Sequence, residues 1–131
     1  MVQIFKLKTF ARFARRERIS DAVLCDAIDR AERGLVNADL GGGLIKQRVA
    51  RPGQGKSGGY RVIIAFRSKL RAVFVFGFAK NELDNIDDDQ LATLRETAAL
   101  WLMADARKVE RAMKDGLLIE VKHGNSKKEK D

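Results

Sequence analysis

Two runs of β-type residues separated by a very short connection constrain the fold of this chain more than any other feature. Residues 59–67 carry large apolar side chains at every second position, and residues 71–79 are rich in Val and Phe. Three residues between them can only join antiparallel neighbours, because a parallel pair needs a crossover of a dozen or more residues. The two runs therefore predict an antiparallel hairpin at the centre of a sheet.

The other elements follow from apolar spacing and capping residues. Ser20 is expected to cap a helix over residues 21–33 that Gly34 ends. Asp87 and Gln90 form a capping box for a C-terminal helix, which we expect to reach Gly116. We also expect a strand over 3–8, a helix over 10–16 capped by Thr9, a strand over 44–50 and a loop over 51–58. The brief apolar segment 117–121 leaves open whether a further strand joins the sheet.

This order of elements predicts the α+β class, in which runs of strands stand beside runs of helices. We expect a small antiparallel sheet with two N-terminal helices and a C-terminal helix packed on it. The helices are expected on one face, with the other face left open. Residues 1–122 are predicted to form a single domain, and the polar, basic residues 123–131 a disordered tail.

Positive charge dominates the centre of the chain. The formal net charge is +8, and no Asp or Glu occurs between residues 40 and 81. Side chains two positions apart on a strand share a face, so Lys46 and Arg48 point the same way, as do Arg61 and Arg67. We expect them to form a concave basic surface on the open face. Such a surface is typical of proteins that bind a polyanion.

Several other classes of protein are disfavoured. Cys25 is the only cysteine, so an internal disulfide is excluded, and its place beside Leu24 in a predicted helix indicates core filler. The only histidine, His123, lies at the edge of the tail, which excludes a two-histidine ribonuclease. No apolar run approaches the length of a membrane span and no secretory signal is visible. We expect a cytoplasmic protein.

The segment at residues 50–57, ARPGQGKS, resembles a phosphate-binding P-loop in which Ala50 replaces the first glycine. A P-loop works because a helix follows it and presents free N–H groups to phosphate. Here a strand is predicted to follow, so we expect a hairpin loop. Its lysine, Lys56, is expected to hold RNA backbone.

Two longer segments carry a resemblance to a known family. Residues 39–61, DLGGGLIKQRVARPGQGKSGGYR, and residues 77–82, GFAKNE, resemble the RelE/HigB toxins of bacterial type II toxin–antitoxin systems, in the RelE/ParE superfamily. The resemblance implies a ribosome-dependent endoribonuclease that cleaves mRNA in the decoding site and so inhibits translation. It also implies a cognate antitoxin, a DNA-binding protein of helix-turn-helix type, as partner. No cofactor and no metal are expected.

The resemblance also implies roles for individual residues. Lys46 and Arg48 match the family's paired basic residues, Arg61 its arginine in the Gly-Tyr-Arg strand, and Lys80 the basic position that ends the last strand. These four are the predicted catalytic residues. The predicted RNA-binding residues are Arg51, Lys56, Tyr60 and Arg67. The family's late tyrosine has no match, because Ile86 lies near its place.

The chemistry of the basic residues agrees with these roles. Cleavage by a ribose 2′-OH needs a base, stabilisation of the crowded phosphate and an acid for the leaving oxygen. The charged form of a lysine is disfavoured by neighbouring cations, so Lys46 is the hypothetical base. Arg48 and Arg61 are the hypothetical stabilisers, since a guanidinium donates two hydrogen bonds to phosphate. Lys80 is a further phosphate contact or the acid.

Two alternatives stay open. The first is a non-catalytic module that binds RNA or the ribosome with the same basic sheet. The second is a ParE-like toxin of the same fold that acts on another target, such as gyrase. In either case we expect an acidic segment of the antitoxin to cover the basic face, because complementary charge steers and specifies binding.

Overall fold

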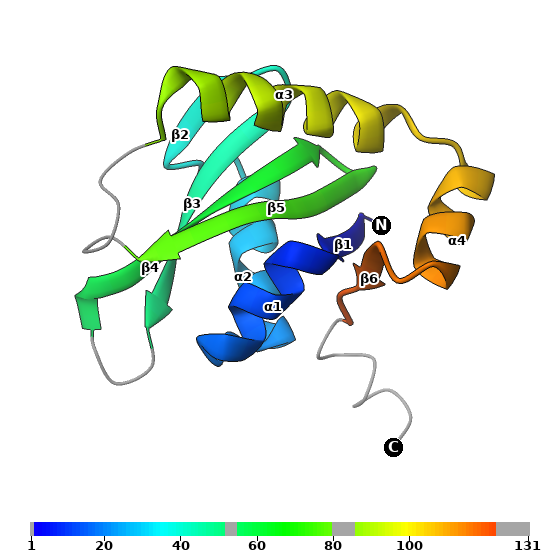
Figure 1. Ribbon diagram of the computed structural model, residues 1–131. Coiled ribbons are helices and arrows are strands. Elements are labelled where there is room, and N and C mark those ends of the chain that lie inside the picture. Colours follow the sequence, from blue (N-terminus) through cyan, green and yellow to red (C-terminus); the bar gives the residue numbers. More distant parts are fainter. Residues whose placement is uncertain (1, 52–54, 80–85, 123–131) are drawn as a thin grey trace.

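The computed structural model describes residues 2–51, 55–79 and 86–122, and it confirms an α+β fold (Figure 1). The elements follow each other in the order β1 (Gln3–Leu7), α1 (Lys8–Arg16), α2 (Asp21–Glu32), β2 (Ala38–Gly41), β3 (Leu44–Arg51), β4 (Gly55–Arg67), β5 (Arg71–Ala79), α3 (Asp88–Met103), α4 (Ala106–Lys114) and β6 (Leu118–Glu120).

The strands of the described residues form one sheet in the order β2-β3-β4-β5-β1-β6. Neighbours are antiparallel except β1 and β5, which are parallel. The predicted hairpin is confirmed: Arg67 pairs with Arg71 and Tyr60 with Ala79. The sheet is larger than the sequence predicts. β2 was not expected, and the segment left open at residues 117–121 contributes β6, which pairs with β1.

Helices cover both faces of this sheet, so the expectation of one open face is wrong. One face packs against α1 and α2, with Phe10, Leu24, Tyr60, Val62 and Phe74 in its core. The other packs against α3 and α4, with Phe5, Ile63, Val73, Ala98 and Leu118 in its core. The first face is already occupied, so the apolar side of α3 can be buried only on the second. We call these the α1/α2 face and the α3 face.

The predicted C-terminal helix is two helices. The backbone of Ala104 is extended (ψ 134°), and the side chain of Asp105 accepts a hydrogen bond from the Lys108 N–H at 2.9 Å, which starts α4. The guanidinium of Arg71 donates to the carbonyls of Trp101 and Ala104 at 2.8 and 2.7 Å, so it binds the end of α3. Within the described residues, no helix has the length and apolar character needed to cross a membrane.

Two of the three predicted helix caps are confirmed and the third is wrong. The Ser20 hydroxyl accepts from the Val23 N–H at 3.3 Å, and Asp87 and Gln90 make the predicted capping box. Thr9, however, lies inside α1. The helix begins at Lys8 directly after β1, and Leu7 occupies the N-cap without a side-chain bond.

The alternation along β3 predicts that Gln47 faces the core, and the structure shows why a polar residue stands there. Gln47 is fully buried, and its Nε2 donates to the carbonyls of Ala27 and Leu35 at 3.0 and 3.1 Å. Its Oε1 accepts from the Asn37 N–H at 2.9 Å. The amide thus ties β3 to the end of α2 and to the chain that leads into β2.

Candidate nucleic-acid interface

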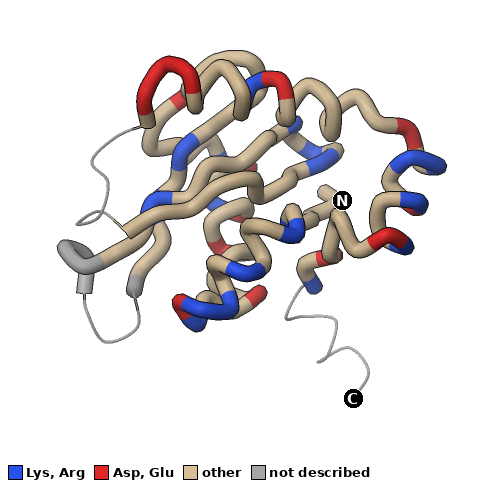
Figure 2. The backbone as a smooth tube through the Cα atoms, viewed as in Figure 1, with Lys and Arg blue, Asp and Glu red and all other residues tan. Residues whose placement is uncertain are grey.

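Lys46, Arg48 and Arg61 lie together on the α3 face, and we call them the cationic cluster. On β3, Lys46 and Arg48 share a face with buried Leu44, and on β4 Arg61 shares a face with buried Ile63. Arg48 pairs directly with Arg61, which places their Cβ atoms about 4.5–5.5 Å apart. Figure 2 shows the basic positions of the central strands on neighbouring segments of the tube. The shared face predicted from the sequence is thus present.

The cluster lies where α3 stops covering the sheet. Lys46 and Arg61 are half-buried and Arg48 is exposed, so the cations border the apolar core but reach water. Burial, and then the positive charge of Arg48, lower the pKa of Arg61. Among the described residues, no carboxylate forms an ion pair with any of the three side chains. This arrangement favours binding of an anion, which would relieve the repulsion between the arginines.

Side chains from α2 and the chain after it fix the backbone under Arg48. β2 pairs with β3 only as far as Lys46. Beyond that point, the Arg48 N–H donates to Asn37 Oδ1 at 2.8 Å, and the Arg48 carbonyl accepts from Arg30 Nη2 at 2.7 Å. Arg30 is held in turn by Asp26 at 3.2 Å. These bonds replace a neighbouring strand and order β3 where it carries the cluster.

Two phenylalanines of β5 continue the same face. Phe78 pairs with Arg61 and Phe76 pairs with Ile63, and their ring centroids are 5.9 Å apart. Next to Phe76, the start of α3 and the sheet enclose a hollow lined by Phe76, Asp89, Gln90, Thr93 and Leu94. The sequence carries no signal for this hollow, because the hollow depends on which face of the sheet α3 covers.

The structure does not bring two of the predicted RNA-binding residues to the cluster. Tyr60 is only 1% exposed on the α1/α2 face, where its hydroxyl donates to Glu17 at 2.7 Å. Arg67 shares the face of Arg61 but lies six residues further along β4, about 20 Å away at strand spacing. It lines a separate hollow at the C-terminal end of α3, with Arg71 and Leu102.

The remaining predicted residues are only partly described. Lys80 lies outside the described residues, and so do the side chains of Arg51 and Lys56. The expected loop over 51–58 is too long, because β3 extends to Arg51 and β4 begins at Gly55, inside the P-loop-like segment. A strand therefore stands where a P-loop would have its helix. Ile86, near the place of the family's tyrosine, is half-buried against the core of the α3 face.

Cys25 is confirmed as a core residue. It is 6% exposed, and its thiol donates to the Lys122 carbonyl at 3.7 Å. Burial, with the negative charges of Asp21 and Asp29, raises its pKa to about 11. The thiol therefore stays protonated near neutral pH and is not a nucleophile.

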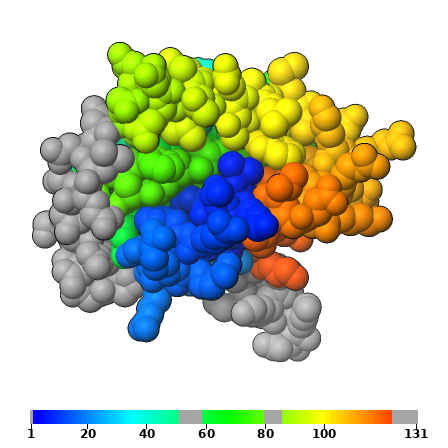
Figure 3. Space-filling model, in the orientation of Figure 1, coloured from blue at the N-terminus to red at the C-terminus, as the bar shows by residue number. Residues whose placement is uncertain are grey.

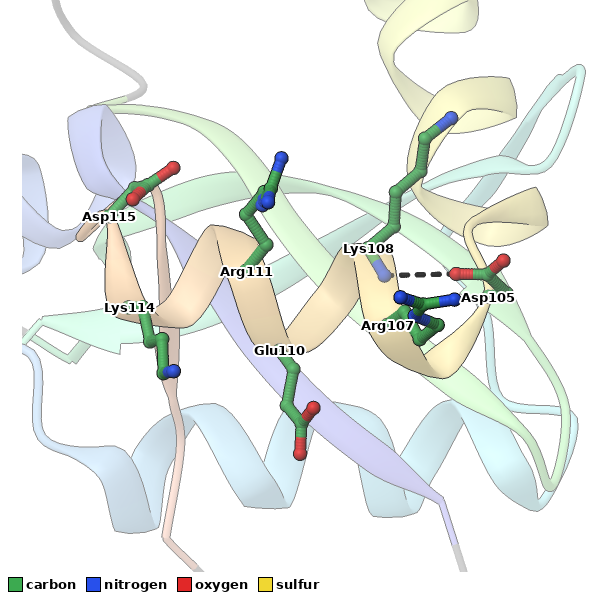
Figure 4. Close-up of a pocket in the computed structure, with 7 residues that line it drawn as sticks. All are labelled: Asp105, Arg107, Lys108, Glu110, Arg111, Lys114 and Asp115. Atoms are coloured by element: carbon green, nitrogen blue, oxygen red, sulfur yellow. Dashed lines mark hydrogen bonds between the residues drawn. The ribbon is translucent and has the colours of Figure 1, made fainter.

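A wider hollow lies elsewhere, along α4, and is a poor binding site. Figure 4 shows that its lining side chains all belong to α4 and its caps and spread away from the helix in different directions. Acidic and basic groups alternate around it, with Glu110 and Asp115 beside Arg111 and Lys114. Without an apolar floor or a common charge, it lacks the features of a ligand site.

Comparison with known proteins identifies the family of this chain. The chain matches the family model described as RelE toxin of RelE / RelB toxin-antitoxin system over residues 2–121. No curated protein matches it significantly. The match extends from β1 to the end of β6 and includes the strands that carry the cationic cluster. This chain belongs to the RelE toxin family of toxin–antitoxin systems.

Proposed function

We propose that this protein is a toxin that inhibits translation by cleaving mRNA on the ribosome. The observation that carries the proposal is the cationic cluster: Lys46, Arg48 and Arg61 share one face, and no described carboxylate neutralises them. Preorganised positive charge at the border of an apolar core is most effective where negative charge develops in a transition state.

The reaction that fits these groups is attack of a ribose 2′-oxygen on the adjacent phosphorus. The Lys46 amine takes the 2′-OH proton while the bond from phosphorus to the 5′-oxygen breaks. Arg48 and Arg61 stabilise the negative charge that builds on the phosphate oxygens. Lys80 is proposed as the acid that protonates the leaving 5′-oxygen, or as a phosphate contact. The products are a 2′,3′-cyclic phosphate and a 5′-hydroxyl.

The partner that the family implies is a cognate antitoxin. We propose that an acidic segment of it covers the cationic cluster and blocks RNA, because complementary charge both steers and orients binding. We further propose that the antitoxin is a DNA-binding protein, and that toxin and antitoxin meet in the cytoplasm, where the ribosomes are.

The decisive experiment compares wild type with Arg61→Ala on induced expression in bacteria. Wild type should arrest growth, and primer extension should reveal new 5′ ends within translated mRNA. Arg61→Ala should abolish both, while circular dichroism shows an intact fold. Arg107→Ala is the matched control, because it removes an equal charge from an exposed position on α4 and should stay toxic.

Other outcomes would reject the proposal. A folded Arg61→Ala protein with full toxicity would remove the cluster from the mechanism. Growth arrest with intact mRNA would indicate the non-catalytic alternative, and DNA-damage signalling on induction would indicate a ParE-like target.

A further inference from the structure

The hollow beside Phe76 is built from β5 and the first two turns of α3. Its volume is about 330 Å³, within the range of roughly 300–1,000 Å³ found for small-molecule sites. Phe76 and Leu94 provide an apolar floor, and Asp89, Gln90 and Thr93 place polar groups around it. An apolar floor with a few polar groups at its border is the usual composition of a site for a flat, partly polar ligand.

Phe76 is accessible because of two irregularities in the sheet. β1 pairs with β5 only from Arg71 to Phe74, so the edge of β5 beyond Phe74 lacks a neighbouring strand among the described residues. A bulge follows, since Ile63 pairs with Phe76 and Ile64 with Phe74. Phe74 is fully buried, whereas Phe76 is half-exposed. Figure 3 shows atoms of the central strands, in green, between α3 and α1.

The hollow adjoins the cationic cluster. Across the sheet, Lys46 pairs with Ile63 and Ile63 with Phe76, so Lys46 and Phe76 flank the same residue. Arg61 is diagonal to Phe76, and such neighbours lie about 7–8 Å apart. A phosphate held by Arg61 therefore leaves its attached nucleoside within reach of the Phe76 ring.

The border of the hollow presents both a donor and an acceptor. The Gln90 Oε1 accepts from the Asp87 N–H at 3.3 Å as part of the capping box. The Nε2 of the same amide is a donor that this bond does not use. The carboxylate of Asp89, on an exposed residue, is an acceptor. Carboxylate and amide side chains are among the groups that read base edges in known complexes.

We propose that this hollow is a nucleobase subsite, in which a base next to the cleaved linkage stacks on Phe76 and is read by Gln90 and Asp89. The inference rests on the proposed function and deepens it, because it assigns a base-selecting role to residues outside the cationic cluster. Aromatic side chains bind bases by stacking in many proteins that hold single strands, and loss of one such contact weakens binding roughly tenfold.

The test uses ribosomes programmed with an mRNA that carries the fluorescent base 2-aminopurine beside a 2′-O-methylated, uncleavable linkage, and an unmodified mRNA in parallel. Wild type should quench the fluorescence and cut the unmodified mRNA with a base preference. Phe76→Leu keeps an apolar side chain but cannot stack in this way. It should lose the quenching, bind roughly tenfold more weakly and cut with a flattened preference. Phe66→Leu, a half-buried phenylalanine of the α1/α2 face, is the matched control.

The polar border has its own test. Gln90→Glu keeps the oxygen of the capping box but replaces the donor, and it should shift the base preference. Ala92→Glu adds the same charge to an exposed position of α3 outside the hollow and should leave the preference unchanged.

The outcomes separate this inference from the proposed function. If wild type cuts mRNA and Phe76→Leu matches it in quenching and preference, the subsite is refuted while the ribonuclease stands. If wild type quenches through Phe76 but never cuts, the subsite stands and the cleavage proposal fails. A Phe76→Leu protein that loses only antitoxin binding would assign the hollow to a peptide and refute the subsite.

Discussion

The two faces of the sheet differ in how their polar side chains are paired, although these side chains are neighbours in the sequence. On the α1/α2 face, every polar group named above has a partner: Tyr60 donates to Glu17, and Gln47 bonds to three backbone groups. On the α3 face, Arg48 and Arg61 pair with each other across the strands, and no described carboxylate joins them. Both faces bury an apolar core, but the α3 face also carries paired cations that no described carboxylate balances.

This difference shows that the position of a residue in its strand, rather than its type, decides which face of the sheet its side chain joins. Tyr60 and Arg61 are consecutive, as are Gln47 and Arg48, yet the members of each pair face different helices. Successive side chains point to opposite faces, so a shift of one residue moves a side chain from one face of the sheet to the other. Substitutions in these pairs should therefore separate stability from activity.

The largest contrast is expected between Tyr60→Ala and Arg61→Ala. Tyr60 packs edge-on against Phe13, with ring centroids 5.6 Å apart, and is buried. Its truncation should lower the free energy of unfolding by about 3–5 kcal/mol. Arg61→Ala should change it by less than about 0.5 kcal/mol. Urea denaturation followed by circular dichroism measures both, and equal losses would end the distinction between the faces.

A similar contrast should hold on β3. Gln47→Leu leaves the Asn37 N–H and the carbonyls of Ala27 and Leu35 without their partner. We expect a loss of about 2–3 kcal/mol, since each buried group deprived of a bond costs about 1–3 kcal/mol and Asn37 can recover water. Lys46→Leu, one residue earlier on the other face, should change stability by less than about 0.5 kcal/mol. The denaturant midpoints of the two variants, each compared with wild type, measure these two changes in stability.

Elements that depend on residues close together in the sequence were predictable, whereas contacts between distant segments were not. The β4–β5 hairpin, the Ser20 cap and the capping box depend on residues within a few positions of one another. The face taken by α3 depends on α1 and α2, which are remote in sequence. The partners of Gln47 are equally remote, so its role could not be predicted.

The candidate site shows the same division. Alternation within each strand predicts that Lys46 and Arg48 share a face and that Arg61 and Arg67 share one. The pairing of Arg48 with Arg61 shows that the two faces are the same. The hollow beside Phe76 needed the β5 bulge and the position of α3, neither of which has a signal in the sequence.

The buried thiol of Cys25, in the core of the α1/α2 face, predicts how the stability of the protein depends on pH. Burial and nearby carboxylates raise the pKa of Cys25 from 9.0 to about 11. The unfolded chain then loses this proton at lower pH than the folded protein does. Stability contributed by the protonated thiol should be complete below about pH 9 and lost as pH rises towards 11, by at most about 2–3 kcal/mol.

Comparison with Cys25→Ala isolates that contribution. The variant should be less stable at neutral pH because it loses buried volume, but its stability should fall less steeply between pH 9 and 11. Parallel slopes for the two proteins in urea titrations would show that Cys25 is solvated in the folded state.

The smallest effect is expected from Arg48→Gln, which tests the unbalanced charge on the α3 face. Removing one of two facing guanidinium groups relieves their repulsion, so the variant should be more stable by up to about 0.5 kcal/mol at low salt. The gain should shrink in about 1 M salt, where the Debye length falls to roughly 3 Å. Arg12→Gln, on an exposed position of α1, controls for net charge. If both variants gain the same stability, the repulsion comes from the net charge of the whole chain and not from the paired arginines. If Arg48→Gln alone gains, and loses RNA cleavage as well, the cluster holds its charges together at a cost in stability that only a bound anion offsets.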